Sequence, residues 1–353
     1  PPAKEVSSYT LPSTVTKIGD QAFGGVKALT AIDFGSTIES IGDLAFANCT
    51  GLTEIFLPAS LYYLGRTPFL GCSGITSVTV SPDNQKFETI DNYLLDKETK
   101  TLLQAFGDIE GNLELPTGIE GIGEYAFSSQ SLLKSITLPA SCKMIGDAAF
   151  AYCDNLNKVN VSEGLETIGQ STFYGCGQLQ DFVFPSTLKT IGGSAFFRCG
   201  LRSANLPEGI ETLGSHIFFE NHAMTEASLP VSAAKSIGGS MFYGCDNLKK
   251  CVLPEGMRSV PEQMFNHCTS LAEVNLPTTL TSIGRSAFNE TILTYVEFPE
   301  GLTSIGDAAF QWTHLKNVVL PDNLDDLGSY SFAWMPELES ISLGKSLIMV
   351  PEN

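Results

Sequence analysis

A phrase of 23 residues recurs along almost the whole chain, and no other feature restricts the possible folds as much. Its consensus is LxxIxLPxxLxxIGxxAFxxCxx, and its second half reads IGDQAF from Ile18 and IGDAAF from Ile145. Fifteen units, whose positions are counted from their first residues, begin at Val6, Leu29, Leu52, Ile75, Glu110, Leu133, Leu156, Leu179, Leu201, Met224, Leu248, Leu271, Leu293, Leu315 and Leu338. One unit cannot bury its apolar side alone, so residues 6–353 are predicted to form a single solenoid, preceded by a tail of residues 1–5.

Each unit is predicted to contribute one short strand. Apolar residues two apart in LxxIxL point to the same side of an extended segment, so positions 4 and 6 enter the core while positions 3 and 5 face solvent. The proline at position 7 cannot donate to a sheet and ends the strand. We expect about 15 coils, with a parallel β-sheet on the concave face and short helical or irregular arms on the convex face. Thirteen units place Phe at position 18, or at its equivalent in the 24-residue unit from Met224, which predicts a stacked aromatic spine.

The repeat is interrupted once. The unit from Ile75 runs 35 residues and lacks the IGxxAF segment. Two apolar runs, 93–95 and 101–104, flank a polar turn at 96–100, a pattern typical of a hairpin. A protruding β-hairpin is therefore predicted within residues 81–108. It is either a local repair of the coil wall or a functional loop.

Composition and charge exclude several functional classes. A hydrophobic fraction of 43% with 22 phenylalanines supplies enough core for a folded chain. The net charge of −19 repels nucleic acid phosphates, so nucleic acid is not an expected partner. No run approaches the ~18–20 apolar residues of a membrane span, and the first residues lack the apolar run of a signal peptide.

The repeated phrase resembles the BspA-like leucine-rich repeats of bacterial surface proteins. The likeness covers essentially residues 6–353, because the 23-residue period and the IGxxAF segment recur throughout. It implies a leucine-rich repeat solenoid. It also implies a cell-surface or secreted location and adhesion to host or cell-surface proteins or to glycans.

Nothing in the sequence predicts catalysis, and we expect a protein that is not an enzyme and needs no cofactor or metal. No nucleophile, zinc or phosphate-loop motif is present. The four histidines form no triad by register, and His222 is assigned to the slot used by cysteine, which favours a packed or hydrogen-bonded ring. Seven of the nine cysteines occupy position 21, or its equivalent in the 24-residue unit from Met224, stack one per coil, and are predicted to be buried and reduced: Cys49, Cys72, Cys153, Cys176, Cys199, Cys245 and Cys268.

Acidic residues recur after the IG pair, at Asp20, Asp43, Glu124, Asp147 and Asp307. A ladder of metal sites is one interpretation. The other, which we favour, is that each carboxylate caps free amides at the start of a short helical turn.

Position 2 of the units carries four basic residues and one acidic residue, against 20 and 39 in the whole chain. Position 3 adds Lys158, Lys250 and Tyr295, and also the acidic Asp181, Glu226 and Glu273. Together the two positions predict a polar docking surface of mixed charge on the concave face, for a protein or a glycan, formed by Lys158, Arg202, Lys249, Lys250, Tyr295 and Lys316. The alternative is that these lysines keep the face soluble and that the chain is a passive spacer or scaffold within a larger surface protein.

Overall fold

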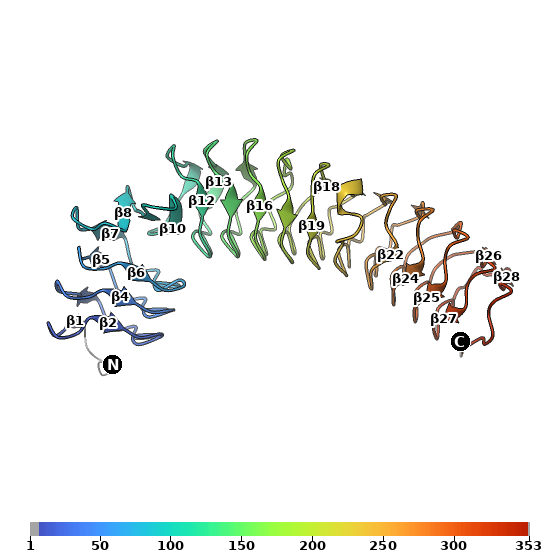
Figure 1. Cartoon of the computed structure of the whole chain (residues 1–353), viewed down its shortest axis with the longest axis horizontal. Coiled ribbons are helices and arrows are strands. Elements are labelled where there is room, and N and C mark those ends of the chain that lie inside the picture. Colours follow the sequence, from blue (N-terminus) through green and yellow to red (C-terminus); the bar gives the residue numbers. More distant parts are fainter. Residues whose placement is uncertain (1–6, 352–353) are drawn as a thin grey trace.

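The computed structural model describes residues 7–351 and shows about fifteen coils stacked into an arch (Figure 1). Nearly all strand pairs between coils are parallel, and the one helical segment among these residues is a 3-10 turn, η1 (Val231–Ala233). The predicted solenoid is thus confirmed, with irregular rather than helical arms. The predicted tail, residues 1–5, lies outside the described residues.

Most coils contribute two strands rather than the one predicted. The first set, called here the outer strands, comes from LxxIxL: β1 (Ser8–Thr10), β3 (Ala31–Asp33), β5 (Glu54–Leu57), β7 (Ser77–Val80), β11 (Gly111–Glu114), β13 (Leu133–Thr137), β15 (Lys158–Asn160), β18 (Ser203–Asn205), β20 (Glu226–Ser228), β21 (Lys250–Val252), β23 (Glu273–Val274), β26 (Asn317–Val319) and β28 (Ser340–Ser342). The second set, the inner strands, ends at the apolar residue before the IG glycine: β2 (Lys17–Ile18), β4 (Ser40–Ile41), β6 (Tyr63–Leu64), β12 (Gly121–Ile122), β14 (Met144–Ile145), β16 (Thr167–Ile168), β17 (Thr190–Ile191), β19 (Thr212–Leu213), β22 (Ser259–Val260), β24 (Ser282–Ile283), β25 (Ser304–Ile305) and β27 (Asp326–Leu327).

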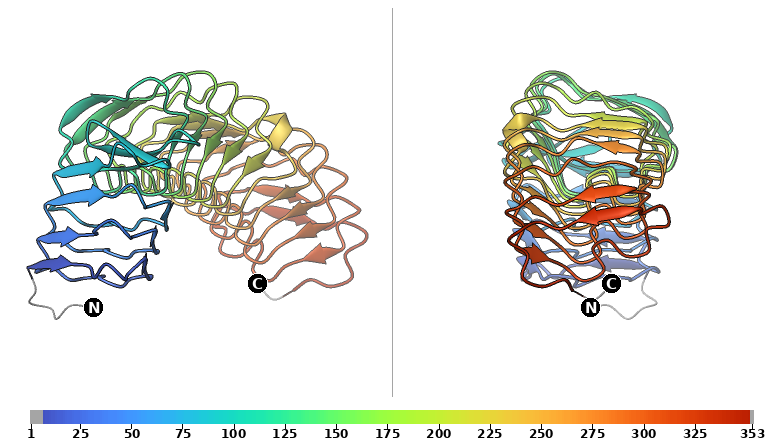
Figure 2. Two further views of the ribbon diagram at one scale, coloured as in Figure 1. Left: turned by 60° about the vertical axis from the view of Figure 1, so that its left-hand side comes forward. Right: turned by 90° about the vertical axis from the view of Figure 1, so that its right-hand side faces the viewer.

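A parallel sheet does line the concave face, but the inner strands form it. Figure 1 places β1, β5 and β28 on the outside of the arch and β2, β6 and β27 on the inside, and the turned view in Figure 2 agrees. The assignment of the LxxIxL strands to the concave face was therefore wrong. The inner ladder is also the more continuous one, since it runs unbroken from β10 (Thr101–Ala105) to β19, whereas the outer strands form separate sheets of two to four.

The glycine of the IG pair allows close approach between coils on the concave side. A Cβ at Gly169 would lie 2.7 Å from the backbone nitrogen of Asp147, and one at Gly192 would lie 2.5 Å from that of Gln170. Only a residue without a side chain lets successive coils approach this closely. The inside of an arch requires such close spacing, and the IG glycines permit it there.

The predicted aromatic spine is present in the core. From Phe127 to Phe332, the rings at position 18 stack with centroids 5.1–5.7 Å apart. All nine cysteines are free and buried. Every thiol at position 21 donates to the carbonyl oxygen of the spine phenylalanine one coil earlier, at 2.9–3.2 Å.

The hairpin lies within the sheet and does not protrude. Strand β9 (Tyr93–Asp96) pairs antiparallel with β10 and also with a strand that was not predicted, β8 (Phe87–Ile90). Strand β10 then continues the inner sheet by pairing parallel with β12. Leu94 and Leu102 are buried because the strands fill the place of the missing IGxxAF segment. We call this junction, between the coil from Leu52 and the coil from Glu110, the seam.

Candidate ligand-binding surface

The six predicted site residues lie on the outer surface and are all exposed. Lys158 is in β15 and Lys250 in β21, while Arg202 and Lys249 immediately precede outer strands. They therefore lie on the convex side rather than on the predicted concave face. At roughly 4.8 Å per coil, the seven steps from Lys158 to Lys316 span about 34 Å. The set is an extended strip and not a compact cluster.

Carboxylates interrupt the positive charge along this strip. The register places Lys250 beside Glu226 of β20 and Glu273 of β23. Lys316 Nζ lies 3.6 Å from Glu337 Oε2. A hydrogen bond from His314 and the charge of Lys316 hold the pKa of Glu337 below its usual range. The strip thus presents mixed charge, as expected for selective polar contacts rather than for general attraction of anions.

Arg202 is fixed by a neighbouring side chain. Its guanidinium Nη2 donates to Gln180 Oε1 at 2.5 Å, and its carbonyl oxygen accepts from Thr225 Oγ1 at 3.3 Å. A ligand that binds Arg202 therefore meets a side chain whose orientation is already restricted.

The surface is hollowed beside Tyr295, whose side chain is 66% exposed. A cleft of about 360 Å³ lies between the coils from Leu271 and Leu293, lined by residues that include Asn275, Tyr295 and Glu297. A smaller one of about 60 Å³ is lined by Lys250, Glu273 and Asn275, so both share Asn275. Sequence reasoning missed this hollow, which opens where the coil from Leu293 forms no outer strand.

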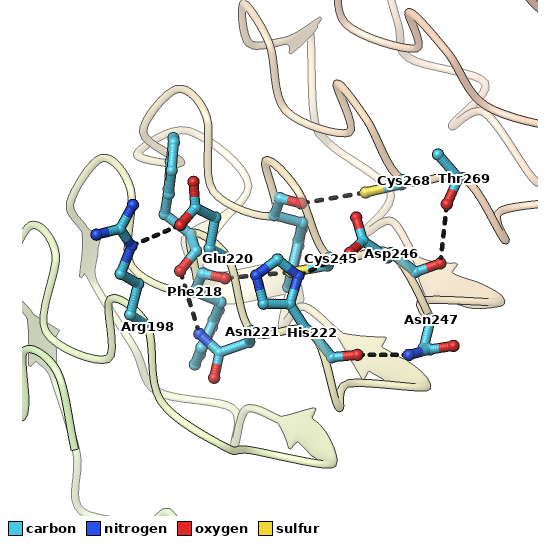
Figure 3. A network of polar contacts seen from close by, with 12 residues as sticks. Arg198, Phe218, Glu220, Asn221, His222, Cys245, Asp246, Asn247, Cys268 and Thr269 are labelled. Atoms are coloured by element: carbon cyan, nitrogen blue, oxygen red, sulfur yellow. Dashed lines mark hydrogen bonds and ion pairs between the residues drawn. The ribbon is translucent and has the colours of Figure 1, made fainter. Parts of the chain in front are cut away.

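A second polar network lies on the flank of the arch, around the cysteine column (Figure 3). Asn221, not His222, occupies the cysteine slot, and its Nδ2 donates to the Phe196 carbonyl oxygen at 2.7 Å. His222 lies one residue later, with a side chain 60% exposed and with Nδ1 2.8 Å from Asp246 Oδ2. The assignment of His222 to the cysteine slot was therefore wrong, because it placed the slot one residue too late in the unit from Leu201. The ring is hydrogen-bonded but not packed.

Four aromatic rings also stack along this flank, at unit position 19 or its equivalent: Tyr174, Phe197, Phe219 and Tyr243. Their centroids are 4.5–4.6 Å apart and the rings are nearly parallel. Arg198 lies over Phe197, 5.4 Å from its centroid, and pairs with Glu220 at 2.5 Å. The signal for this ladder was visible in the sequence as an aromatic residue directly after the spine phenylalanine in consecutive units.

The acidic residues after the IG pair link coils and cap no helix. Asp147 Oδ1 accepts from the Gln170 backbone nitrogen at 2.8 Å, and Asp43 Oδ1 accepts from that of Arg66 at 2.7 Å. The capping interpretation was right about the amide partners but wrong about the helical turn. Within residues 7–351, no group of three or more His, Cys, Asp or Glu side chains could hold a metal ion. The same residues contain no helix long and apolar enough to cross a membrane.

Comparison with known proteins gives a consistent family. The model described as "BspA type Leucine rich repeat region (6 copies)" matches residues 3–106, 103–225 and 235–353. No match was found among curated proteins.

Several solved structures are similar. A leucine-rich repeat protein from Bacteroides ovatus is 28% identical, covers 96% of this chain and 88% of its own, and has a TM-score of 0.60. The pneumococcal vaccine antigen PcpA is 22% identical over 86% of this chain and 62% of its own, with a TM-score of 0.53. A leucine-rich cell surface protein from Faecalibacterium prausnitzii is 24% identical over 70% of this chain and 60% of its own, with a TM-score of 0.52.

Proposed function

Because the chain belongs to the BspA-type leucine-rich repeat family, we propose that it is a non-enzymatic recognition module that binds a protein or a glycan at the cell surface or outside the cell. The resemblance to the repeats of bacterial surface proteins supports the location. Its binding surface is the outer strip of Lys158, Arg202, Lys249, Lys250, Tyr295 and Lys316.

The cleft beside Tyr295 is the observation that carries this proposal. It combines an exposed aromatic ring with amide and carboxylate groups, and it lies two coils from Lys250. Aromatic and polar groups around a hollow are typical of binding surfaces, since the ring contributes apolar contact and the polar groups fix orientation. A spacer needs neither feature.

A binding screen against extracellular matrix proteins and a glycan array tests the proposal. Once a ligand is identified, the triple variant Arg202→Glu, Lys249→Glu and Lys316→Glu should weaken binding at least tenfold or so at low salt and reduce its salt dependence. The matched control reverses Lys143, Lys189 and Lys235, which carry the same charge on the inner side of the coils. Equal loss in both triple variants would indicate a net-charge effect, and no ligand in either screen would favour the spacer.

A further inference from the structure

A repeated set of backbone hydrogen bonds joins the coils beside the aromatic spine. In most coils the N–H groups at positions 16, 18 and 20, or at their equivalents, donate to carbonyl oxygens of the next coil. Tyr125, Phe127 and Ser129, for example, donate at 2.8–2.9 Å to the carbonyl oxygens of Asp147, Ala149 and Ala151. The acceptors are alternate residues that run from the third position of the next IGxxAF segment to the residue just after it. Each coil therefore presents a row of donors that matches one stretch of extended backbone.

The coil from Leu52 is different, because the unit after it lacks that segment. Within residues 7–351, the N–H groups of Thr67, Phe69 and Gly71 have no acceptor, although a further coil follows them. Thr67 and Gly71 have φ values of +44° and +71°, similar to +53° and +59° at the equivalent Leu44 and Asn48. The donors therefore keep the orientation that points toward the seam.

The hairpin replaces the missing backbone hydrogen bonds on only one side of the seam. Ala105 donates to the Ala126 carbonyl oxygen at 2.9 Å, in place of a regular coil's spine residue. On the other side, among the residues that the structure describes, only the Gln104 side chain bridges the gap in this row, since its Nε2 donates to the Phe69 carbonyl oxygen at 3.2 Å. That bond replaces the missing cysteine thiol but leaves the three N–H groups without an acceptor.

Two cavities border the first and the last of these three donors, Thr67 and Gly71. One of about 130 Å³ is lined by Leu64, Thr67, Pro68, Leu94 and Leu103 among others. The other, of about 140 Å³, is lined by residues that include Leu70, Gly71 and Ala105. Gln104 lines both, so its side chain divides one longer gap into two parts.

The charges around the seam favour a neutral occupant. At the first cavity Arg66 forms a two-point ion pair with Glu124, with N–O distances of 2.9 and 2.6 Å, so its charge is already balanced. Asp108 lines the second cavity, and the whole chain carries a charge of −19. An anion would be repelled, whereas the carbonyl oxygen of a peptide bond is a neutral acceptor.

We propose that the seam is a docking site for an extended peptide segment of a partner protein, whose main-chain carbonyl groups at alternate residues accept hydrogen bonds from Thr67, Phe69 and Gly71. The segment displaces the Gln104 side chain and runs along the joined cavities. Binding of this kind uses main-chain hydrogen bonds for affinity, as when a peptide adds a strand to a sheet edge. It does not depend on the outer strip described above.

Hydrogen exchange read by mass spectrometry or NMR tests the site. The probe is a neutral peptide of small residues, acetyl-AGASAGA-amide, titrated into the whole protein. Without peptide, the amides of Thr67, Phe69 and Gly71 should exchange much faster than those of Leu44, Phe46 and Asn48. At a peptide concentration ten times the dissociation constant, exchange at residues 66–72 should slow roughly tenfold while the other coils stay unchanged.

Two substitutions at one residue should act in opposite directions. Gln104→Ala joins the cavities and should tighten binding, whereas Gln104→Trp fills them and should abolish it. Gln178→Trp, on an exposed position of another coil, is the control and should leave binding unchanged. Slow exchange of the three amides in the free protein would overturn the proposal. Absence of peptide protection in both the unchanged protein and Gln104→Ala would also do so.

Discussion

The Cys176 thiol donates a hydrogen bond of 3.1 Å to the carbonyl oxygen of Phe150, 26 residues earlier and one coil away. The residue at position 21 therefore does more than fill space, because it joins the core of one coil to the backbone of the coil before. Asn221 makes the same connection with an amide, and Gln104 makes it across the seam. Thr291 and Thr313 are too short to do so, and each donates instead to the phenylalanine carbonyl of its own coil.

This equivalence predicts how substitutions at Asn221 behave. Asn221→Ala leaves both the Phe196 carbonyl oxygen and the Leu201 amide without partners, so it should reduce the free energy of unfolding by roughly 2–4 kcal/mol. Asn221→Cys restores the first bond and should recover a large part of that loss. Urea unfolding followed by circular dichroism measures both. Asn157→Ala, on an exposed asparagine, is the control and should change stability by less than about 0.5 kcal/mol. Equal losses for Ala and Cys would contradict the shared role.

A second prediction concerns the oxidation state of the cysteines. All nine are buried in the native protein, and stacked parallel side chains do not present the crossed geometry of a disulfide. A thiol reagent should therefore label almost none in the folded protein and nine after denaturation without reductant. A count near one in the denatured protein would mean that four disulfides had formed.

The same burial predicts loss of stability at alkaline pH. Desolvation raises the pKa of Cys142 to about 11 and the pKa values of Cys153 and Cys245 to about 12, from an ordinary value near 9. Below pH 9 these thiols are protonated in both states, so their contribution is fully present. Between pH 9 and pH 11–12 the unfolded chain loses protons that the native protein retains. Each such cysteine should then remove about 1.4 kcal/mol per pH unit from the free energy of unfolding.

Urea unfolding at a series of pH values from 8 to 11 checks this effect. Tyrosines and lysines also titrate in this range, so a single-residue comparison is needed. Cys153→Ala removes one of these titrating groups. In this variant the free energy of unfolding should therefore fall less steeply above pH 9, by about 1.4 kcal/mol per pH unit. An unchanged slope would show that the buried thiols are not responsible.

The sequence predicted the structural features that repeat from unit to unit, but not the features that depend on contacts between coils. The spacing of Phe173 and Phe196 predicted the spine, because identical positions in successive coils must stack. The two-residue inner strands were missed because a segment such as Thr167–Ile168 is too short to show alternation. The concave side was misassigned because curvature depends on the difference in coil spacing between the two walls. No single unit reveals that difference.

For the candidate surface, the sequence predicted residue types and exposure but not their surroundings. The exposure of Lys250 and Tyr295 followed from strand alternation. The carboxylates beside Lys250 depend on the register between three strands, and the cleft beside Tyr295 depends on how two neighbouring coils pack. The cysteine-slot error at His222 arose because a single-residue difference in unit length moves every later position by one.

The close approach at the IG glycine gives the last prediction, and the chain provides its own control. A Cβ at Gly192 would meet the backbone of the preceding coil at 2.5 Å, whereas a Cβ at Gly19 has nothing within 4 Å. Both glycines follow an inner strand, and neither has a positive φ.

Gly192→Ala must push two coils apart and should destabilise the protein by about 1–3 kcal/mol. Gly19→Ala should be neutral or stabilising by up to ~1 kcal/mol, because it only restricts the unfolded chain. Thermal unfolding compares the two, and small-angle scattering should show a more open arch for Gly192→Ala alone. Equal stability of the two variants would mean that this contact does not set the coil spacing on the concave side.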